Sequence, residues 1–318
     1  MKKPRVIFMG TPEFAVTTLD RLINHGVNIV GVITAPDKVS GRGRKINQSA
    51  VKKYADLNGI PTLQPENLKA EVFLTELKEY KAELQIIVAF RMLPEAVWRM
   101  PSMGTINLHA SLLPKYRGAA PINWAIINGE RETGVTTFFL QHQIDTGDII
   151  MQKSTPIGQG MTAGELHNKL AIMGSDLIAD TYDSVCNGDA GGVAQHTLIS
   201  GELKEAPKIF KQDCKIDWKL NCNKICNLIR GLSPLPGAWT VLQTDQDVKL
   251  SFKIFEAKFT ETKHSKEPGA IQTENRDLKI YCTDGYISII ELQMEGKRKM
   301  HVDDFLRGTH INHNWKAI

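Results

Sequence analysis

The sequence predicts an α/β protein, with a doubly wound, mostly parallel, Rossmann-like sheet followed by a small C-terminal β-barrel. Up to about residue 205, short apolar segments alternate with amphipathic ones, as strands and helices do in an open parallel sheet. Beyond that point, short runs of alternating apolar residues recur about every ten residues, which favours an all-β barrel. A turn-rich break at Ser233–Gly237 precedes these runs.

The chain begins with a strand–helix–strand unit. A strand is expected at Arg5–Met9 and a second at Val27–Thr34. Between them, Thr11 can cap a helix, Pro12 suits its first position, and Gly26 is expected to end it. No Gly-x-Gly-x-x-Gly follows the first strand, so the binding of a dinucleotide is not favoured.

The remaining elements continue both patterns. Further helices are expected at Gln48–Asn58, Lys69–Tyr80, Pro94–Arg99, 119–128 and Thr162–Cys186. Further strands of the sheet are expected at Ile60–Leu63, Leu84–Phe90, Thr105–His109, Val135–Leu140 and Asp148–Lys153. The barrel strands are expected at Trp239–Gln243, Val248–Ala257, Gly269–Gln272, Leu278–Cys282 and Tyr286–Gln293, which an OB-like barrel would fit. We therefore expect two domains, residues 1–205 and 206–318.

The composition indicates an ordinary globular protein. Of 318 residues, 42% are hydrophobic and 23% charged, and no apolar run approaches the ~20 residues needed to span a membrane. The apolar stretch Val6–Met9 is too short for a signal peptide, so we expect a cytoplasmic protein. The five cysteines, an odd number, do not suggest a disulfide framework. Cys222 and Cys226 are four apart but lack further ligands at zinc spacing nearby, so buried thiols are favoured over a metal site.

The net charge of +4 is unevenly spread along the sequence. Residues 1–207 hold 21 basic and 21 acidic side chains, whereas residues 208–318 hold 18 basic and 14 acidic ones. The cluster Lys297, Arg298 and Lys299 follows Glu295–Gly296, a pair that suggests an exposing turn. Such an excess suggests a polyanionic partner only weakly, and a solvated face with spare lysines remains the alternative.

The segment Gly104–Pro121 is the richest in residues that can carry chemistry. Asn107 and His109 are two apart on an expected strand, so their side chains share a face next to the carboxyl end of the strand. A second polar turn, Asp145–Asp148, follows a strand that could lie beside the first. Taken singly, a strand histidine is more often structural and an Asp-Thr-Gly aspartate a turn former. An aspartic protease would need paired carboxylates in an all-β context.

Together these side chains suit the transfer of an acyl group to nitrogen. Attack of an amine on a formyl group develops an oxyanion, to which Asn107 and a protonated His109 can donate hydrogen bonds. Asp145 can orient and charge His109 or take the proton of the amine through water. The amine is itself the nucleophile, so no nucleophilic serine or cysteine is needed. The pattern does not by itself identify a formyl group.

Nearly the whole chain resembles the folate-dependent formyltransferases, and among them the members that act on methionyl-tRNA. The motifs that carry this resemblance are Phe8–Phe14, Thr34–Asp37, Ser40–Lys45, Asn107–His109, Ser111–Pro114, Arg117–Pro121, Asp145–Asp148 and Lys215–Trp218. The resemblance implies transfer of the formyl group of 10-formyltetrahydrofolate to the free amino group of initiator methionyl-tRNA. The product would be N-formylmethionyl-tRNA, for translation initiation.

The resemblance also implies roles for individual residues. It makes Asn107, His109 and Asp145 catalytic, and it implies that no metal is used. The residues implied to line the folate site are Ser111, Leu112, Leu113 and Pro114. The residues of the implied tRNA-contacting loop are Arg42, Arg44 and Lys45. The C-terminal OB-like domain is implied to help hold the tRNA, and we add Lys297, Arg298 and Lys299 as candidate contacts. We infer neither a membrane nor an obligate protein partner.

One loop departs from the family pattern. The family commonly has Ala-Tyr-Gly, two apolar residues and Leu-Pro before the catalytic strand, whereas this chain has the shorter Ala89–Pro94, Ala-Phe-Arg-Met-Leu-Pro. Backbone contacts to the pterin ring are therefore expected to differ.

Two other functions remain open from the sequence. A formyltransferase for a small amine, such as an amino-sugar nucleotide or glycinamide ribonucleotide, would keep the catalytic trio. An RNA-binding protein with a degenerate enzyme domain is disfavoured, because the trio is intact.

Overall fold

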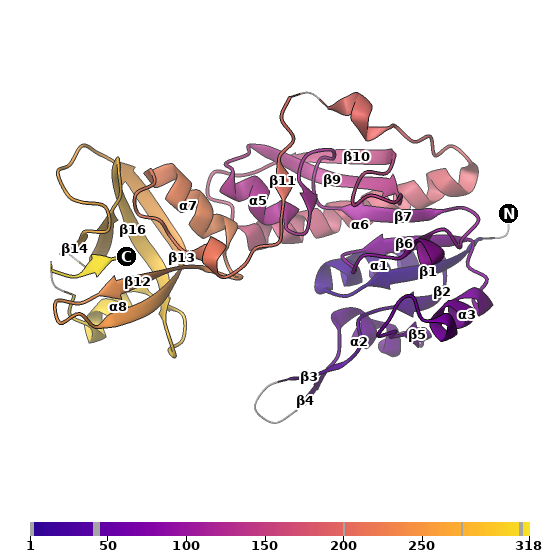
Figure 1. Ribbon diagram of the computed structural model, residues 1–318, viewed down its shortest axis with the longest axis horizontal. Coiled ribbons are helices and arrows are strands. Elements are labelled where there is room, and N and C mark those ends of the chain that lie inside the picture. The colour runs from indigo at the N-terminus through magenta and orange to yellow at the C-terminus, as the bar shows by residue number, and fades with distance from the viewer. Residues whose placement is uncertain (1–2, 41–44, 200, 275, 312–313) are drawn as a thin grey trace. The chain divides into compact units, whose positions relative to one another are not determined.

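The computed structural model describes all residues except 1–2, 41–44, 200, 275 and 312–313, and it divides into two compact units (Figure 1). The sheet unit consists of Met1–Gly118, Thr133–Thr155 and His167–Glu205. The barrel unit consists of Ala119–Glu132, Pro156–Leu166 and Ala206–Ile318. Two segments from before residue 205 thus belong to the barrel unit, and the expected functional domains 1–205 and 206–318 stay a prediction.

The sheet unit is built on a seven-stranded sheet of order β10-β9-β7-β6-β1-β2-β5. Its strands are β1 (Arg5–Gly10), β2 (Asn28–Ile33), β5 (Thr62–Leu63), β6 (Leu84–Val88), β7 (Thr105–His109), β9 (Glu132–Phe139) and β10 (Ile149–Pro156). The strands from β5 to β7 are parallel, and β9 pairs antiparallel with β7. The expected mostly parallel sheet is confirmed, and its central strands are buried along nearly their whole length, as covered parallel strands must be.

Helices supply the apolar cover of this sheet. Those before β7 are α1 (Glu13–Asn24), α2 (Ala50–Leu57), α3 (Glu71–Glu79) and α4 (Glu95–Trp98), and the long α6 (Ala163–Asn187) comes later. Ile7 and Met9 of β1 share one buried cluster with Phe73 and Leu77 of α3. Because side chains alternate across a strand, these two β1 residues define one face of the sheet and their neighbours the other.

The ends of α1 test two of the sequence expectations. Gly26 ends the helix as expected: it has a positive φ of 79°, and Val27 N–H donates to Leu22 O across the last turn. Thr11 was expected as the cap, and this is wrong. Pro12 itself occupies the capping position in an extended conformation, and its carbonyl accepts from Ala15 N–H at 2.9 Å. The first helical residue is therefore Glu13, one position later than expected.

The barrel unit is an antiparallel sheet of order β14-β15-β16-β13-β12-β18 that nearly closes on itself, as expected. Its strands are β12 (Ala238–Gln243), β13 (Lys249–Glu261), β14 (Ile271–Glu274), β15 (Asp277–Tyr281), β16 (Gly285–Met294), β17 (Met300–His301) and β18 (Lys316–Ala317). β18 pairs with β12, and a bridge from Lys316 to Ala270 brings it to the residue before β14. Buried residues alternate along β12 and β16, so each presents one face to a core that helix α7 helps to fill.

The remaining elements are short. They are α5 (Pro121–Ile127), α7 (Cys222–Gly231), α8 (Val302–Gly308), β3 (Lys38–Ser40), β4 (Lys45–Asn47), β8 (Arg117–Gly118), β11 (Glu205–Ala206) and the 3-10 turns η1 (Gln195–Leu198) and η2 (Gln212–Cys214). The sequence did not predict the hairpin of β3 and β4, in which Val39 pairs with Ile46. Among the described residues, no helix is both long and apolar enough to cross a membrane.

Candidate active site

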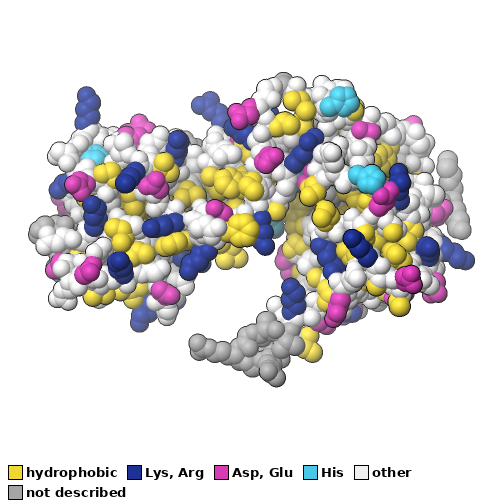
Figure 2. Space-filling model, viewed as in Figure 1, with side chains coloured by type: hydrophobic (Ala, Val, Ile, Leu, Met, Phe, Trp, Pro, Cys, Tyr) yellow, Lys and Arg dark blue, Asp and Glu magenta, His cyan; other side chains and the backbone are white. Residues whose placement is uncertain are grey.

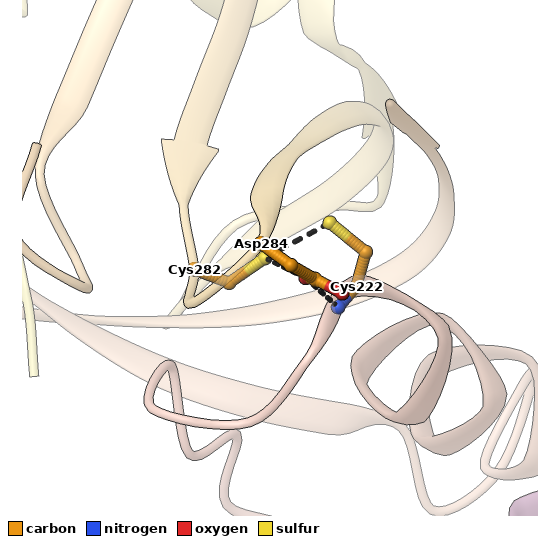
Figure 3. Close-up of side chains that lie close together, drawn as sticks. All are labelled: Cys222, Cys282 and Asp284. Atoms are coloured by element: carbon orange, nitrogen blue, oxygen red, sulfur yellow. Dashed lines mark hydrogen bonds between the residues drawn. The ribbon is translucent and has the colours of Figure 1, made fainter. Parts of the chain in front are cut away.

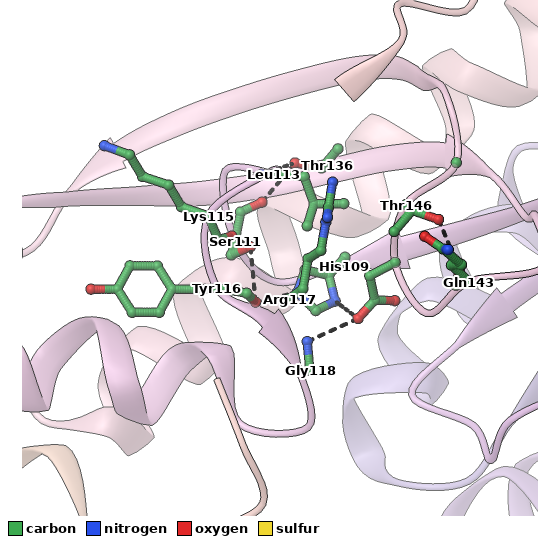
Figure 4. A network of polar contacts seen from close by, with 12 residues as sticks. His109, Ser111, Leu113, Lys115, Tyr116, Arg117, Gly118, Thr136, Gln143 and Thr146 are labelled. Carbon is green, nitrogen blue, oxygen red and sulfur yellow. Dashed lines mark hydrogen bonds and ion pairs between the residues drawn. The ribbon is translucent and has the colours of Figure 1, made fainter. Parts of the chain in front are cut away.

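His109 ends strand β7 with both ring nitrogens directed at acceptors (Figure 4). Its Nε2 lies 2.8 Å from Tyr116 O, and because a carbonyl can only accept, Nε2 carries a hydrogen. Its Nδ1 lies 3.7 Å from Asp145 Oδ2, close enough for an ion pair but too far for a hydrogen bond. The ring is buried. One nitrogen of His109 is therefore fixed to the backbone, and the other is left for chemistry beside a carboxylate.

Asp145 is held in place by the backbone around it. Its Oδ2 accepts from Gly118 N–H at 3.0 Å, the second contact of the oxygen that faces His109 (Figure 4). The residue has a positive φ of 53°, a conformation that aspartate tolerates better than most side chains. Its side chain is only 12% exposed. The turn after β9 thus lies at the end of β7, as expected from the sequence.

Gln195 supports this turn from a distant part of the chain. Its Nε2 donates to Asp145 O and to Gly147 O, both at 2.8 Å. Its Oε1 accepts from Arg117 at Nε, 3.0 Å, and at a second guanidinium nitrogen, 2.6 Å. The glutamine is 2% exposed, so every polar atom of its side chain is used within the fold. Sequence reasoning missed Gln195, since nothing in its local pattern reveals a partner fifty residues earlier.

Asn107 lies two residues before His109 on the same face of β7. The strand places it between Ile87 of β6 and Phe138 of β9. Its side chain is partly exposed, and no hydrogen-bond partner for it is found in the part of the chain that the structure describes. An amide in this position has two N–H donors to offer to a ligand beside His109.

The loop Ser111–Tyr116 is tied tightly to the sheet. Thr136 Oγ1 donates to Ser111 O at 2.6 Å and accepts from Leu113 N–H at 3.2 Å, while Gln152 Nε2 donates to Leu113 O at 2.8 Å. Ser111 Oγ donates to Lys115 O at 2.7 Å, which closes the loop on itself. These contacts fix where Tyr116 O meets His109. Sequence reasoning did not identify Thr136 or Gln152.

The four residues expected to line a folate site differ in exposure. Ser111, Leu113 and Pro114 are buried, and Leu112 is partly exposed. Leu112 is thus the most exposed of the four, and the assignment of these residues to folate stays a prediction.

The shortened loop Ala89–Pro94 is anchored by Arg91. Its guanidinium donates to Glu66 O at 2.9 Å and to Pro65 O, and it lies 5.5 Å from the centre of the Phe90 ring. Burial lowers the pKa of this arginine from its ordinary value. The charged side chain that departs from the family pattern therefore serves to tie one strand-end loop to the next.

The residues expected to contact tRNA are only partly described. Arg42 and Arg44 lie outside the described residues, and Lys45 is the first residue of β4. The sequence predicted an exposing turn at Glu295–Gly296, and the structure confirms it: Gly296 has a φ of 75°. The residues that follow it, Lys297, Arg298 and Lys299, are all exposed. Lys299 forms an ion pair with Glu291 and its ammonium lies 5.1 Å from the centre of the Phe255 ring. Its charge is thus partly neutralised within the fold.

Two family models match the chain. The formyl transferase model matches residues 3–181, and the model of the formyl transferase C-terminal domain matches residues 208–310. The chain therefore belongs to the formyl transferase family.

Full-length relatives narrow the comparison. The methionyl-tRNA formyltransferase of Bacteroides thetaiotaomicron is 49% identical over 320 residues, covering 99% of this chain and 99% of the relative. That of Flavobacterium johnsoniae is 52% identical over 308 residues, covering 97% of each chain.

Solved structures share the fold at low sequence identity. HypX from Aquifex aeolicus in complex with tetrahydrofolic acid has a TM-score of 0.64 and 17% identity, over 96% of this chain and 47% of HypX. This chain therefore spans about half the length of HypX. The sugar 3N-formyl transferase WlaRD, solved with dTDP and 5-N-formyl-THF, has a TM-score of 0.64 and 20% identity, over 94% of this chain and all of WlaRD.

Proposed function

We propose that this protein transfers the formyl group of 10-formyltetrahydrofolate to the amino group of initiator methionyl-tRNA, giving N-formylmethionyl-tRNA for translation initiation. The relatives that bear this activity in their names are about half identical over their full length. The observation that carries the chemistry is the grouping of Asn107, His109 and Asp145 at the end of β7, with the amide of Asn107 unused by the described residues.

The donor supplies an activated formyl group, and the side chains stabilise its transfer. A bond forms between the methionyl nitrogen and the formyl carbon, the bond to the folate nitrogen breaks, and negative charge develops on the formyl oxygen. Asn107 can donate a hydrogen bond to that oxygen, as can a hydrogen on His109 Nδ1. Such donors are worth about 2.7–4 kcal/mol each when aimed at developing charge.

His109 and Asp145 act as a pair in this proposal. His109 Nε2 is occupied by Tyr116 O, so Nδ1 is the atom at which a proton is gained or lost. Asp145, 3.7 Å from Nδ1, stabilises the imidazolium that forms when this nitrogen takes up a proton. The proton released by the amine passes through this pair or through water to the departing folate nitrogen, so that tetrahydrofolate leaves as the second product.

The donor set fits a folate formyl donor. Asn107 carries an amide that has no hydrogen-bond partner among the described residues, and it lies near the carboxyl edge of the sheet, where open α/β sheets bind ligands. We assign Ser111, Leu112, Leu113 and Pro114 to the folate site beside it, on a loop that Thr136 and Gln152 hold rigid. We expect the reaction to need no metal.

The tRNA would be held by basic side chains of both units. We assign this role to Arg42, Arg44, Lys45, Lys297, Arg298 and Lys299. Residues 1–205 would then carry out the transfer and residues 206–318 would help to hold the tRNA. We expect the enzyme to be cytoplasmic and to need no obligate protein partner.

A comparison of acceptors tests this function. Purified protein would be given formyl-labelled 10-formyltetrahydrofolate with charged initiator methionyl-tRNA, uncharged initiator tRNA, glycinamide ribonucleotide or a dTDP-amino sugar. We expect label to enter methionyl-tRNA with a kcat/KM at least about 100-fold above that for any small amine. Preferential labelling of a small amine would overturn the assignment of the acceptor while keeping formyl transfer. No transfer to any acceptor would remove both.

A further inference from the structure

Three side chains able to bind a metal converge in the barrel unit. Cys222 is the first residue of α7, and Cys282 and Asp284 lie in the turn between β15 and β16 (Figure 3). One ligand atom from each lies within 4.8 Å of the others, and no other such group of three or more occurs among the described residues. The cluster plays no part in the formyl-transfer site, which belongs to the sheet unit.

The contacts within the cluster are close and partly fixed. The two sulfur atoms are 3.0 Å apart, and Cys282 Sγ is 3.8 Å from Asp284 Oδ1. Asp284 Oδ1 also accepts from Cys222 N–H at 2.8 Å, which holds the carboxylate at the start of α7. Gly285 permits this approach, because a Cβ there would lie 2.9 Å from Cys222 Sγ.

The donor set of the cluster suits a cation. Both cysteine residues are buried, and the carboxylate of Asp284 lies beside their sulfur atoms. Thiolates select soft cations such as zinc, and a bound ion deprotonates the coordinating thiols.

We propose that Cys222, Cys282 and Asp284 bind a thiophilic divalent cation of the zinc type. Zinc binds sulfur at about 2.3 Å and carboxylate oxygen at about 2.0–2.2 Å, so in a tetrahedral site a sulfur and an oxygen lie roughly 3.6 Å apart and two sulfurs roughly 3.8 Å apart. The sulfur–carboxylate separation of 3.8 Å is close to the first of these values, and the two sulfurs, now 3.0 Å apart, must part by less than about 1 Å. Binding releases two thiol protons and leaves two sulfur–metal bonds and one oxygen–metal bond.

The donor set distinguishes this proposal from a simple cross-link. A disulfide would use the two sulfur atoms and leave Asp284 without a part in it. Cys226, one helical turn after Cys222, is also buried but is not part of the group of three. The ion would join the start of α7 to the β15–β16 turn, two parts of the barrel unit about 60 residues apart in sequence.

Metal content and cobalt binding test the proposal on the full-length, reduced and untagged protein. We expect about one zinc per chain after purification without chelator. Cobalt added to the metal-free protein should give the near-ultraviolet charge-transfer band of a cobalt–thiolate bond. Replacing even an outer-shell partner costs a metal site roughly 10–100-fold, so Cys282→Ser and Asp284→Asn should each weaken cobalt binding at least about tenfold.

Two further variants keep the test interpretable. Cys214→Ser is the matched control, because Cys214 is also a buried thiol of the barrel unit but lies outside the cluster, and it should bind cobalt as the parent does. Asp284→Asn keeps an acceptor for Cys222 N–H and decides the matter if Cys282→Ser does not fold. Cobalt affinity unchanged in Asp284→Asn, no saturable binding by the reduced parent, or a Cys222–Cys282 disulfide in its place would overturn the proposal.

Discussion

At the scale of single residues, some atoms of the candidate site are held by contacts within the fold, and others remain available to a ligand. Tyr116 O fixes one nitrogen of His109, and Gly118 N–H and Gln195 fix Asp145. Among the described residues, His109 Nδ1 has an ion-pair partner in Asp145 but no hydrogen-bond partner, so it remains available to a ligand. Asn107 differs from both, because its amide is committed to no described neighbour.

Gln195 provides a test of this positioning. Gln195→Ala would remove this partner from the buried Gly147 O, the partly buried Asp145 O and the Arg117 guanidinium, at about 1–3 kcal/mol for an unsatisfied buried group. We expect the free energy of unfolding, measured by urea denaturation, to fall by about that amount. We expect kcat to fall at least about tenfold, while the KM for tRNA stays within about twofold.

A fall in kcat together with the loss of stability would show that Gln195 positions the site as well as stabilising the fold. Gln159→Ala removes an exposed glutamine and should change neither quantity. If Gln195→Ala loses stability but keeps the parent kcat, the glutamine has a structural role only.

At the scale of elements, the turn between β9 and β10 carries Asp145 to the end of β7. A Cβ added to Gly147 would collide with Phe139 O, so the turn can only pass this close to β9 with glycine there. We expect Gly147→Ala to lower kcat by at least about tenfold by displacing Asp145. Formyl-transfer assays at saturating substrates would measure it. Gly191→Ala, where the added Cβ meets nothing within 4 Å, is the matched control, and equal activity of the two variants would contradict this account.

The sequence predicted elements well where the pattern is local. The apolar runs of β1, β6 and β7 and the alternation in β12 and β16 identified their strands within about two residues. Asn107 and His109 were placed on one face by strand periodicity, and Asp145 was placed near them by the polar turn after the following strand. The resemblance then implied that all three are catalytic.

What the sequence could not predict depends on contacts between distant segments. Gln195 reaches Asp145 across fifty residues, and Arg91 finds Pro65 and Glu66 across about twenty-five. The proline at the start of α1 was expected inside the helix but caps it, because boundaries depend on backbone geometry that composition does not fix.

At the scale of the whole molecule, the uneven charge along the sequence disappears when the charges are summed over the two structural units. Residues 119–132 and 156–166 add more acidic than basic side chains to the barrel unit, which leaves a net +2 on each unit. On the face shown in Figure 2, basic side chains are scattered among acidic and apolar ones. Any attraction of tRNA to the barrel unit must therefore come from local clusters rather than from its overall charge.

The cluster Lys297–Lys299 offers a graded test. Arg298 is exposed, whereas Lys299 is already paired with Glu291. We expect Arg298→Ala to raise the KM for tRNA more than Lys299→Ala does, and to reduce its dependence on salt concentration, because fewer counterions are released. Steady-state assays at several salt concentrations would show it. Equal, negligible effects of both changes would indicate that this turn is only a solvated surface.

Deleting residues 206–318 would be a poorer experiment. In the barrel unit, Asn123 donates to Gly231 O, and Ile127 packs against the core that α7 helps to form. A truncated chain would expose these residues, so point variants give the cleaner result.

The glycine-rich segment with Arg42 is the second candidate contact. We expect Arg42→Ala to raise the KM for methionyl-tRNA, lower kcat, or both, since a cation among glycines suits a polyanion. Folate binding, followed by fluorescence titration, should not change. Lys53→Ala, which removes an exposed charge from α2, controls for a general loss of charge. An unaltered response to tRNA would show that Arg42 is a bystander.

The most direct test of the account is the rate of formyl transfer to methionyl-tRNA in single-turnover experiments at saturating enzyme and folate donor. For Asn107→Ala, His109→Ala and Asp145→Ala, we predict at least a ~100-fold fall in this rate, as expected for the loss of one oxyanion donor or of the group that charges it. The circular dichroism and the affinity for tRNA should match those of the parent. Near-normal transfer by any one folded variant would contradict the role given to that residue, and near-normal transfer by all three would contradict the site.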